Sequence, residues 1–253
     1  MNSKLRILSL FLVIGLLSFL NIGGCNDDNN NNNNDGIVEL LCAEPNVDIS
    51  VCDPENGPFS LEIDNEFFPL IVGTESVLEG EDDEGAEIMV TITVTPDTLM
   101  VAGVETRIVE EDEFEDGERV ETSWNYYAQA PDGTVCYFGE DVDIYEDGEV
   151  VAHTGEWRAG EDGNLPGIIM EAVPQIGDIF KQEDAPDIAE DQAEIVAIGE
   201  ELDLGELGVY DDTVTTEDCN PFDGSMDDKV YISGIGLAKD EDAELVSFEP
   251  GME

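Results

Sequence analysis

Residues 119–129 read Arg119-Val120-Glu121-Thr122-Ser123-Trp124-Asn125-Tyr126-Tyr127-Ala128-Gln129, and this stretch decides the fold class of the chain. Its even-numbered residues form one face and its odd-numbered residues form the other. Glu87–Thr95 alternates in the same way, with Ile88, Val90, Ile92 and Val94 on one face. A period of two is typical of a β-strand with one buried face, so the chain is predicted to be mainly β.

Turn signals join such strands into hairpins. Asp-Gly pairs recur at 116–117, 132–133, 147–148 and 162–163, and Asp-Gly favours two-residue hairpin turns because both positions tolerate a positive φ. We therefore predict an all-β antiparallel meander over roughly 60–250. The predicted strands are 70–79, 86–95, 99–112, 118–129, 134–145, 149–158, 178–183, 192–198, 208–217, 228–238 and 243–248.

Helical signals are few. The best are Asp187–Gly199, where Asp187 is suited to an N-cap, and Phe222–Asp228. Residues 159–177 are rich in Gly and Pro and are predicted to form a long loop. Its apolar triplet 168–170 is expected to plug the end of the core.

Residues 1–24 have the pattern of a lipoprotein signal peptide. Lys4 and Arg6 precede an uncharged stretch, Ile7–Leu20, that is shorter than the ~20 residues of a membrane-spanning helix. Ile22-Gly23-Gly24-Cys25 resembles a lipobox, the motif whose cysteine is lipidated and becomes the new N-terminus. The motif implies a lipid anchor at Cys25 in the bacterial cell envelope. The residues after Cys25 favour the outer membrane, on either its periplasmic or its surface face.

The rest of the chain divides into three parts. Residues 25–36 are Asn-rich and free of apolar side chains beyond Cys25, so they are expected to form a flexible tether. Residues 37–64 form a segment that contains cysteines, and 65–253 form the β-rich domain.

Four cysteines remain beyond Cys25, namely Cys42, Cys52, Cys136 and Cys219. An even number in an exported chain suggests two disulfides, for which three pairings exist. Cys42 and Cys52 close a short loop, so they are predicted to pair with each other, which leaves Cys136 with Cys219. A zinc site is disfavoured because the chain has no Cys-x-x-Cys pair and only one histidine.

Charge excludes some partners. The chain has 63 Asp and Glu against 8 Lys and Arg, for a net charge of -55. Nucleic acid is excluded because its phosphates require clustered bases, and so is adsorption to anionic lipid through a basic patch. A hydrophobic content of 41% favours a folded domain over a disordered acidic chain.

Several motifs resemble a broad, largely uncharacterised group of secreted bacterial β-rich domains. Asn65-Glu66-Phe67-Phe68-Pro69-Leu70 resembles its opening, and Trp124–Gln129 with Tyr137–Glu140 is similar to its central hairpin. Gly208–Asp212 and Tyr231–Lys239 resemble its last motifs. The resemblance covers 65–248 and implies a curved sheet or open barrel, similar in outline to periplasmic lipoproteins that carry lipid moieties. It implies no catalytic residues.

A curved sheet has a concave face on which a ligand can lie. Trp124, Tyr126, Tyr137 and Trp157 are the aromatic side chains expected to line it as an apolar ligand site. The alternative is that these four residues simply pack the core.

Acidic clusters raise two other possibilities. Oxygen ligands for calcium are offered by Glu79–Glu84, Glu110–Glu118, Glu140–Glu149, Glu183–Asp191 and Glu200–Glu206. The alternative is a solvated acidic surface, and no cluster fits an EF-hand loop. Paired carboxylates could also serve a glycan hydrolase. The lone His153 is expected to be partly buried beside a carboxylate.

The sequence therefore predicts a membrane-anchored envelope lipoprotein that acts as a non-enzymatic binding or structural module for an apolar ligand or an envelope partner. It requires no cofactor in this interpretation. The alternatives are a calcium-binding surface protein and, more remotely, a carboxylate-dependent glycan hydrolase.

The acid excess also makes a prediction about stability. Unscreened carboxylates repel one another, so the melting temperature should rise between dilute buffer and roughly 1 M NaCl. Thermal unfolding followed by circular dichroism at several salt concentrations measures this, and a melting temperature that does not change would contradict it.

Overall fold

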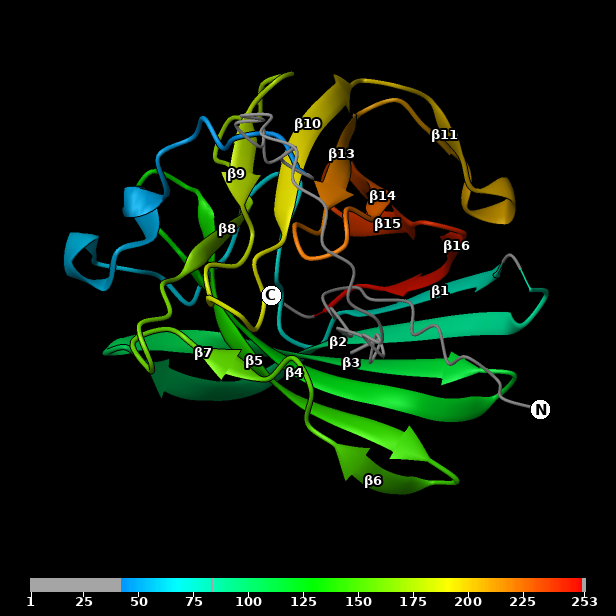
Figure 1. The fold of residues 1–253 in the computed structure, drawn as a ribbon. Helices are drawn as coiled ribbons and strands as arrows, with labels where there is room; N and C mark the ends of the chain where they lie inside the picture. Colours follow the sequence, from blue (N-terminus) through cyan, green and yellow to red (C-terminus); the bar gives the residue numbers. More distant parts are fainter. Residues whose placement is uncertain (1–41, 83, 252–253) are drawn as a thin grey trace, which may run out of the picture.

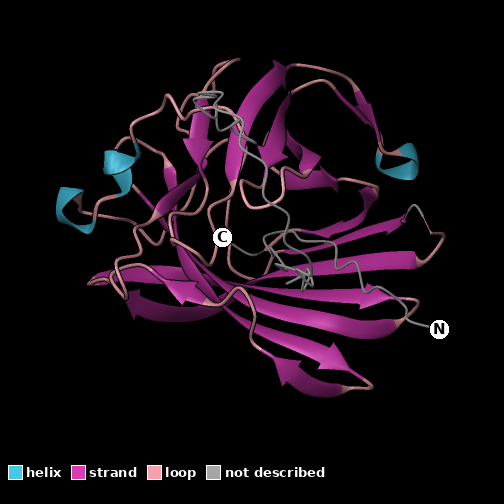
Figure 2. Ribbon diagram, viewed as in Figure 1, coloured by secondary structure: helices cyan, strands magenta, loops and turns pink. Residues whose placement is uncertain are grey.

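The fold is known from a computed structural model that describes residues 42–82 and 84–251. The predicted signal peptide 1–24, the lipidation site Cys25 and the tether 25–36 lie outside the described residues. Figure 1 shows the chain from blue to red, and Figure 2 shows that nearly all its regular structure is strand. The all-β prediction is confirmed.

One large antiparallel sheet of 14 strands forms the molecule, and it is curved and open rather than closed into a barrel. Its strands follow the order β6-β5-β4-β3-β2-β1-β16-β15-β14-β13-β10-β9, with β7 and β8 both paired to β5. The first strand, β1, therefore pairs with the last, β16. Figure 1 shows that β9, β10 and β13 run at a large angle to the strands β1 to β6.

The strands of the first half are β1 (Glu75–Glu81), β2 (Glu87–Val101), β3 (Val104–Glu115), β4 (Glu118–Gln129), β5 (Val135–Glu146), β6 (Glu149–Ala152), β7 (Trp157–Arg158) and β8 (Gly167–Met170). Those of the second half are β9 (Ile179–Lys181), β10 (Gln192–Ile198), β13 (Thr213–Cys219), β14 (Met226–Ile232), β15 (Gly236–Asp240) and β16 (Ala243–Glu249). A separate pair consists of β11 (Leu202–Asp203) and β12 (Val209–Tyr210). Within residues 42–82 and 84–251 the helical segments are three short 3₁₀ turns, η1 (Ile49–Cys52), η2 (Pro54–Asn56) and η3 (Gly205–Leu207).

Two of the predicted Asp-Gly turns connect neighbouring strands as expected. Asp116 and Gly117 have φ of 51° and 79° between β3 and β4, and Asp147 and Gly148 have 54° and 77° between β5 and β6. A third turn of the same kind was missed, because Ala102 occupies the first position with φ 51°. For this reason the predicted strand 99–112 is wrong: it runs across the turn from β2 into β3.

Other boundaries also differ from the predictions. The predicted strands 149–158, 208–217 and 228–238 are each divided into two by a turn. Both helix predictions are wrong, since 187–199 contains β10 and 222–228 leads into β14. The predicted loop 159–177 contains β8, whose apolar triplet is fully buried and pairs with β5. For the two helix predictions and the predicted loop, pairing with neighbouring strands outweighed the local signal.

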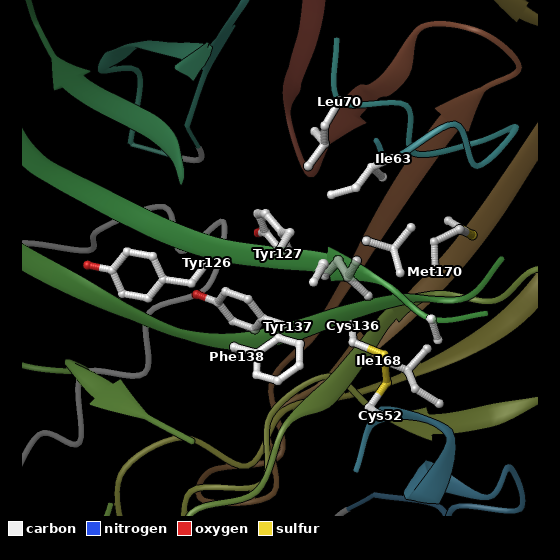
Figure 3. Packing of buried hydrophobic residues seen from close by; sticks show 14 of the residues in the cluster. Cys52, Ile63, Leu70, Tyr126, Tyr127, Cys136, Tyr137, Phe138, Ile168 and Met170 are labelled. Carbon is white, nitrogen blue, oxygen red and sulfur yellow. A yellow bond between two sulfur atoms is a disulfide. The ribbon is translucent and has the colours of Figure 1, made fainter. Parts of the chain in front are cut away.

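The main core lies where β4, β5 and β8 meet. Tyr127, Tyr137, Phe138, Ile168 and Met170 are all completely buried there. Figure 3 shows Ile168 directly beside the disulfide that joins Cys52 to Cys136. β5 accommodates β7 only because position 139 is glycine. It has φ 121°, and a Cβ there would collide with the backbone of β7.

The disulfides join Cys42 to Cys219 and Cys52 to Cys136, so the predicted pairing is wrong. The prediction relied on closeness in sequence. Instead, η1 lies against the core and places Cys52 beside β5, at a Cα–Cα distance of 5.5 Å from Cys136. Both bridges therefore tie the segment before the domain to strands far along the chain.

Replacing Cys52 and Cys136 by Ala should lower the free energy of unfolding by about 2–4 kcal/mol, because their bridge closes a loop with a sequence separation of 84 residues. Urea unfolding of the oxidised protein measures the loss. Peptide mapping without reduction provides the control, and recovery of a peptide that links Cys42 to Cys52 would contradict the structure.

Candidate functional site

The inner face of β3, β4 and β5 carries carboxylates. The ladder pairs Glu113 with Glu121 and Asn125 with Glu140, and alternate residues along a strand share a face. Glu111, Glu113, Glu121 and Glu140 are each at most 4% exposed. Because this face is turned into the curve of the sheet, the acids lie inside the molecule.

The opposite wall supplies a buried base. Lys229 on β14 is 4% exposed, and its Nζ lies 3.4 Å from Asp218 Oδ2 on β13 and 3.7 Å from Asp240 Oδ1 on β15. Asp218 also accepts a hydrogen bond of 3.0 Å from Gln182. Lys229 and Glu111 line the same pocket, so the two walls of the curved sheet meet at this point.

Aromatic rings fill the space beside these acids. The rings of Tyr127 and Tyr137 are stacked with centroids 4.9 Å apart, and Trp157 meets Tyr137 edge-on at 5.5 Å. The Tyr137 hydroxyl donates to Asn125 Oδ1 at 2.6 Å, and Trp157 Nε1 donates to Glu183 Oε1 at 3.1 Å. These contacts fix the rings against the carboxyl groups.

Phe68 connects the two walls. Its ring lies 5.3 Å from that of Tyr127 on β4 and 6.2 Å from that of Tyr231 on β14. Asn65 holds this residue in place, because its Oδ1 accepts hydrogen bonds from the backbone N–H groups of Phe67 and Phe68 at 3.0 and 3.1 Å. The opening motif of the domain thus positions an aromatic side chain at the site.

Several buried polar atoms have no hydrogen-bond partner within the part of the chain that the structure describes. They include the hydroxyl of Tyr127, which is fully buried, and the Oε2 atoms of Glu111 and Glu121. Burial holds the pKa of Tyr127 well above its usual range, and the charges of Glu111 and Glu140 add to this shift. Buried polar atoms normally find a partner, and an unpaired one indicates a bound water, ion or ligand.

Burial changes how these groups titrate. It raises the pKa of Glu111 to about 8, with Asp240 and Glu121 adding to the shift and Lys229 opposing it. It also raises the pKa of Glu121 to about 8, and it holds the pKa values of Glu140 and Glu183 well above the usual range. Burial alone would lower the pKa of Lys229, but Asp240 and Asp218 hold it above its ordinary value. At neutral pH Glu111 and Glu121 are therefore mainly protonated.

A small pocket lies between the two walls, beside Glu111 and Lys229. Its volume is about 40 Å³, and it is lined by apolar side chains that include Phe68, Ile235 and Leu237, with Glu111 and Lys229 among its polar groups. Sites for drug-sized apolar ligands have volumes of roughly 300–1,000 Å³. The pocket instead has room for about three water-sized groups.

The four aromatic residues predicted to form one ligand site lie on two faces. Tyr137 and Trp157 belong to the interior, as described above. Trp124 is on the other face of β4, where its Nε1 donates to Glu110 Oε2 at 2.8 Å. Tyr126 shares that face, beside the guanidinium of Arg158, and Figure 3 shows it directed away from Tyr127 and Tyr137.

The acids of the interior were missed by sequence reasoning. In β4 the face that carries Trp124 looked like the buried one, whereas the face with Glu121, Ser123, Asn125 and Tyr127 is turned inward. One signal in the sequence could have identified the inward face. Glu121, Ser123, Asn125 and Tyr127 occupy successive odd-numbered positions, and Arg119 is the one base on that face of the strand.

The acidic clusters that offered calcium ligands do not form a metal site among the described residues. Among residues 42–82 and 84–251, no three His, Cys, Asp or Glu side chains are placed together to hold a metal ion. His153 has a side chain 61% exposed rather than partly buried, and its Nδ1 lies 3.0 Å from Asp143 Oδ1, so the predicted carboxylate neighbour is present.

Comparison with known proteins does not assign the chain to a family. No protein-family model, curated protein or solved structure matches the chain. Among the described residues, none of the helical segments has the length and apolarity needed to cross a bilayer.

The raised pKa values predict an unusual pH dependence of stability. A glutamate whose pKa is higher in the folded state binds its proton more tightly there. Its contribution to stability is therefore complete below the unfolded pKa and is lost as the pH rises through the folded value. The free energy of unfolding should fall between pH 5 and 8, by about 1.4 kcal/mol per pH unit for each such group.

Glu121→Gln should flatten this slope and stabilise the protein at pH 8, because the amide is neutral at every pH. Glu118→Gln, an exposed position on the same strand, is the matched control and should leave the slope unchanged. Urea unfolding at intervals from pH 5 to 8 measures both, and a stability that rises over this range would refute the buried-acid assignment.

Proposed function

We propose that this chain is a lipid-anchored protein of the bacterial outer membrane that acts as a non-enzymatic binding module. The signal-peptide pattern of 1–24, the lipobox ending at Cys25 and the Asn-rich tether support the anchor. Two disulfides among the described residues are in keeping with an exported protein. In this proposal the tether holds the β domain away from the membrane surface.

The observation that carries the binding function is a set of buried polar atoms without partners, one of which belongs to Glu111, a residue that lines the small pocket. A structural core would be expected to satisfy its buried hydroxyl and carboxyl groups. Here the Tyr127 hydroxyl and the Oε2 atoms of Glu111 and Glu121 are without partners among the described residues. A bound molecule would supply the missing hydrogen bonds.

The dimensions of the pocket favour a small polar ligand over an acyl chain. Its volume of about 40 Å³ is several times below that of a site for a large apolar molecule. The apolar ligand expected from the sequence is therefore not part of the proposal, while the binding role is retained.

Mass spectrometry of the full chain, expressed in a bacterial host that lipidates proteins and extracted from its membranes, tests the proposal. The mature protein should begin at Cys25 and carry several acyl chains, because a single chain gives only marginal anchoring. Cys25→Ala should abolish acylation and release the protein from the membrane fraction.

Cys42→Ser is the matched control for this change. It removes a cysteine that the structure places in a disulfide and should leave both acylation and membrane association intact. Native mass spectra of the same material should show a small additional mass on the folded protein. An unprocessed chain in the cytosol would overturn the anchor, and an interior that stays empty under native conditions would count against the binding role.

A further inference from the structure

Two ionisable residues line the small pocket, and both are deeply buried. Glu111 on β3 and Lys229 on β14 are each 4% exposed and come from opposite walls of the curved sheet. The rest of the lining is apolar apart from the side chains of Thr74, Ser76 and Tyr231, which carry hydroxyl groups. The charge and hydrogen bonding of Glu111 and Lys229 therefore decide which class of molecule the pocket can hold.

A cation is disfavoured in this pocket because Lys229 already places one there. The Nζ of Lys229 lies 3.4 Å from Asp218 Oδ2 and 3.7 Å from Asp240 Oδ1. Burial alone would lower the pKa of Lys229, but Asp240 and Asp218 hold it above its ordinary value, so the ammonium stays charged. A second cation beside it would be repelled strongly, since charges are poorly screened inside a protein.

An anion is disfavoured for the opposite reason. Burial raises the pKa of Asp240 to about 6, so this carboxyl is still mainly ionised at neutral pH. Asp218 and Asp240 together then outweigh the single ammonium of Lys229. A further buried negative charge would be costly in a chain whose net charge is already -55. A neutral molecule is the class that remains.

Glu111 offers such a molecule a hydrogen-bond donor and an acceptor side by side. The ion pairs of Lys229 that the structure shows are with Asp218 and Asp240, and the Oε2 atom of Glu111 has no hydrogen-bond partner among the described residues. Burial raises the pKa of Glu111 to about 8, so its carboxyl is protonated at neutral pH. A protonated carboxyl has one O–H donor and keeps acceptor capacity on its oxygens.

We propose that this pocket binds a short neutral carboxamide, of which acetamide is the model, through reciprocal hydrogen bonds with Glu111. The proposal names the ligand class of the binding function proposed above and rests on it. A carboxamide carries a C=O acceptor next to N–H donors. It can accept from the O–H of the protonated carboxyl and donate to the other carboxyl oxygen, while its alkyl group contacts the apolar lining.

The pocket limits the size of the amide. A volume of about 40 Å³ has room for about three water-sized groups, which matches the methyl, carbonyl and amino groups of acetamide. Aromatic and long-chain amides are too large. Because so small a ligand makes few contacts, its dissociation constant is expected to be no lower than about 40 µM.

The need for a proton on Glu111 makes binding depend on pH. The other charged or titratable groups around it are Glu113 on its own strand, Glu121 and Tyr127 on β4, Tyr137 and Glu140 on β5, Lys229 and Tyr231 on β14, and Asp240 on β15. Acetamide itself does not titrate in this range. Its affinity should therefore be constant from pH 6 to 7 and roughly tenfold weaker at pH 9 than at pH 7.

Methyl NMR of the full lipidated chain in detergent tests the assignment, with acetamide as the probe. Titration should shift the methyl signals of Ile92, Val94 and Leu237, which line the pocket, in a saturable way. The signals of Val150 and Val151, which are exposed on β6, should not move. Sodium acetate and methylammonium chloride, compared with NaCl at equal ionic strength, test the exclusion of charged ligands. Ethanol is neutral but lacks the paired carbonyl and amino groups, and it should bind at least several-fold more weakly than acetamide.

Glu111→Leu should weaken acetamide binding at least tenfold, because it removes both hydrogen-bonding groups from an otherwise apolar wall. Glu111→Gln keeps a neutral donor and acceptor at every pH, so it should still bind acetamide and should lose the decrease between pH 7 and 9. Glu75→Gln, at an exposed position on β1, is the matched control and should bind as the unaltered protein does. Circular dichroism verifies that each variant is folded, and the pH profile of the unaltered protein decides the matter if a variant is not.

Four results would overturn the proposal. They are acetate or methylammonium binding more tightly than acetamide, ethanol binding as tightly as acetamide, an acetamide affinity that does not fall between pH 7 and 9, and unchanged binding in Glu111→Leu. Methyl signals that no probe shifts would also overturn it, because the pocket would then hold ordered water only.

The two proposals fail in different ways. A protein that is acylated at Cys25 and carries another small molecule in native spectra, but does not bind acetamide, keeps the binding function and loses the amide. A protein found unprocessed in the cytosol loses the anchored function whatever it binds.

Discussion

Carboxyl groups buried inside a curved sheet are the constraint on which the rest of this structure depends. Glu111, Glu121 and Glu140 come from three adjacent strands and face inward, where burial raises their pKa values. A group of this kind destabilises the fold when it is ionised without a partner. The protein must therefore supply protons, a cation or its own base to this interior, and Lys229 is the one buried base among residues 42–82 and 84–251.

The remainder of the fold holds the two walls of this interior in place. Phe68 contacts Tyr127 on one wall and Tyr231 on the other. Two disulfides tie the segment before the domain to β5 and to the end of β13. Because the walls are joined by rings and covalent links, the acids stay buried even though the sheet is open.

Some parts of this structure could be read from residue patterns and others could not. The alternation in 119–129 predicted β4 with its boundaries nearly correct, and the Asp-Gly pairs at 116–117 and 147–148 predicted two turns. These features depend only on neighbouring residues. The β2–β3 turn escaped notice because Ala102 has no turn preference, although the pairing of the two strands holds it at a positive φ.

The candidate site was predictable only in part, because alternation shows that a strand has two faces but not which of them is inside. The four aromatic residues were expected on one concave face, but only Tyr137 and Trp157 belong to the interior. Trp124 and Tyr126 lie on the opposite face, beside Glu110 and Arg158. Both faces of β4 carry aromatic residues, so hydrophobicity alone could not separate them. The curvature of the sheet and the arrival of β14 settled the choice.

The sequence by itself determined the all-β class, the acidity of the chain and the position of most strands, because these follow from composition and from contacts between residues close in the chain. Only the tertiary structure decided how the cysteines pair and which acids are buried together. The bridges span 84 and 177 residues, and Glu111 lines the same pocket as Lys229, which is more than a hundred positions away in the sequence. Such contacts depend on how distant strands are brought side by side, and no local pattern records that.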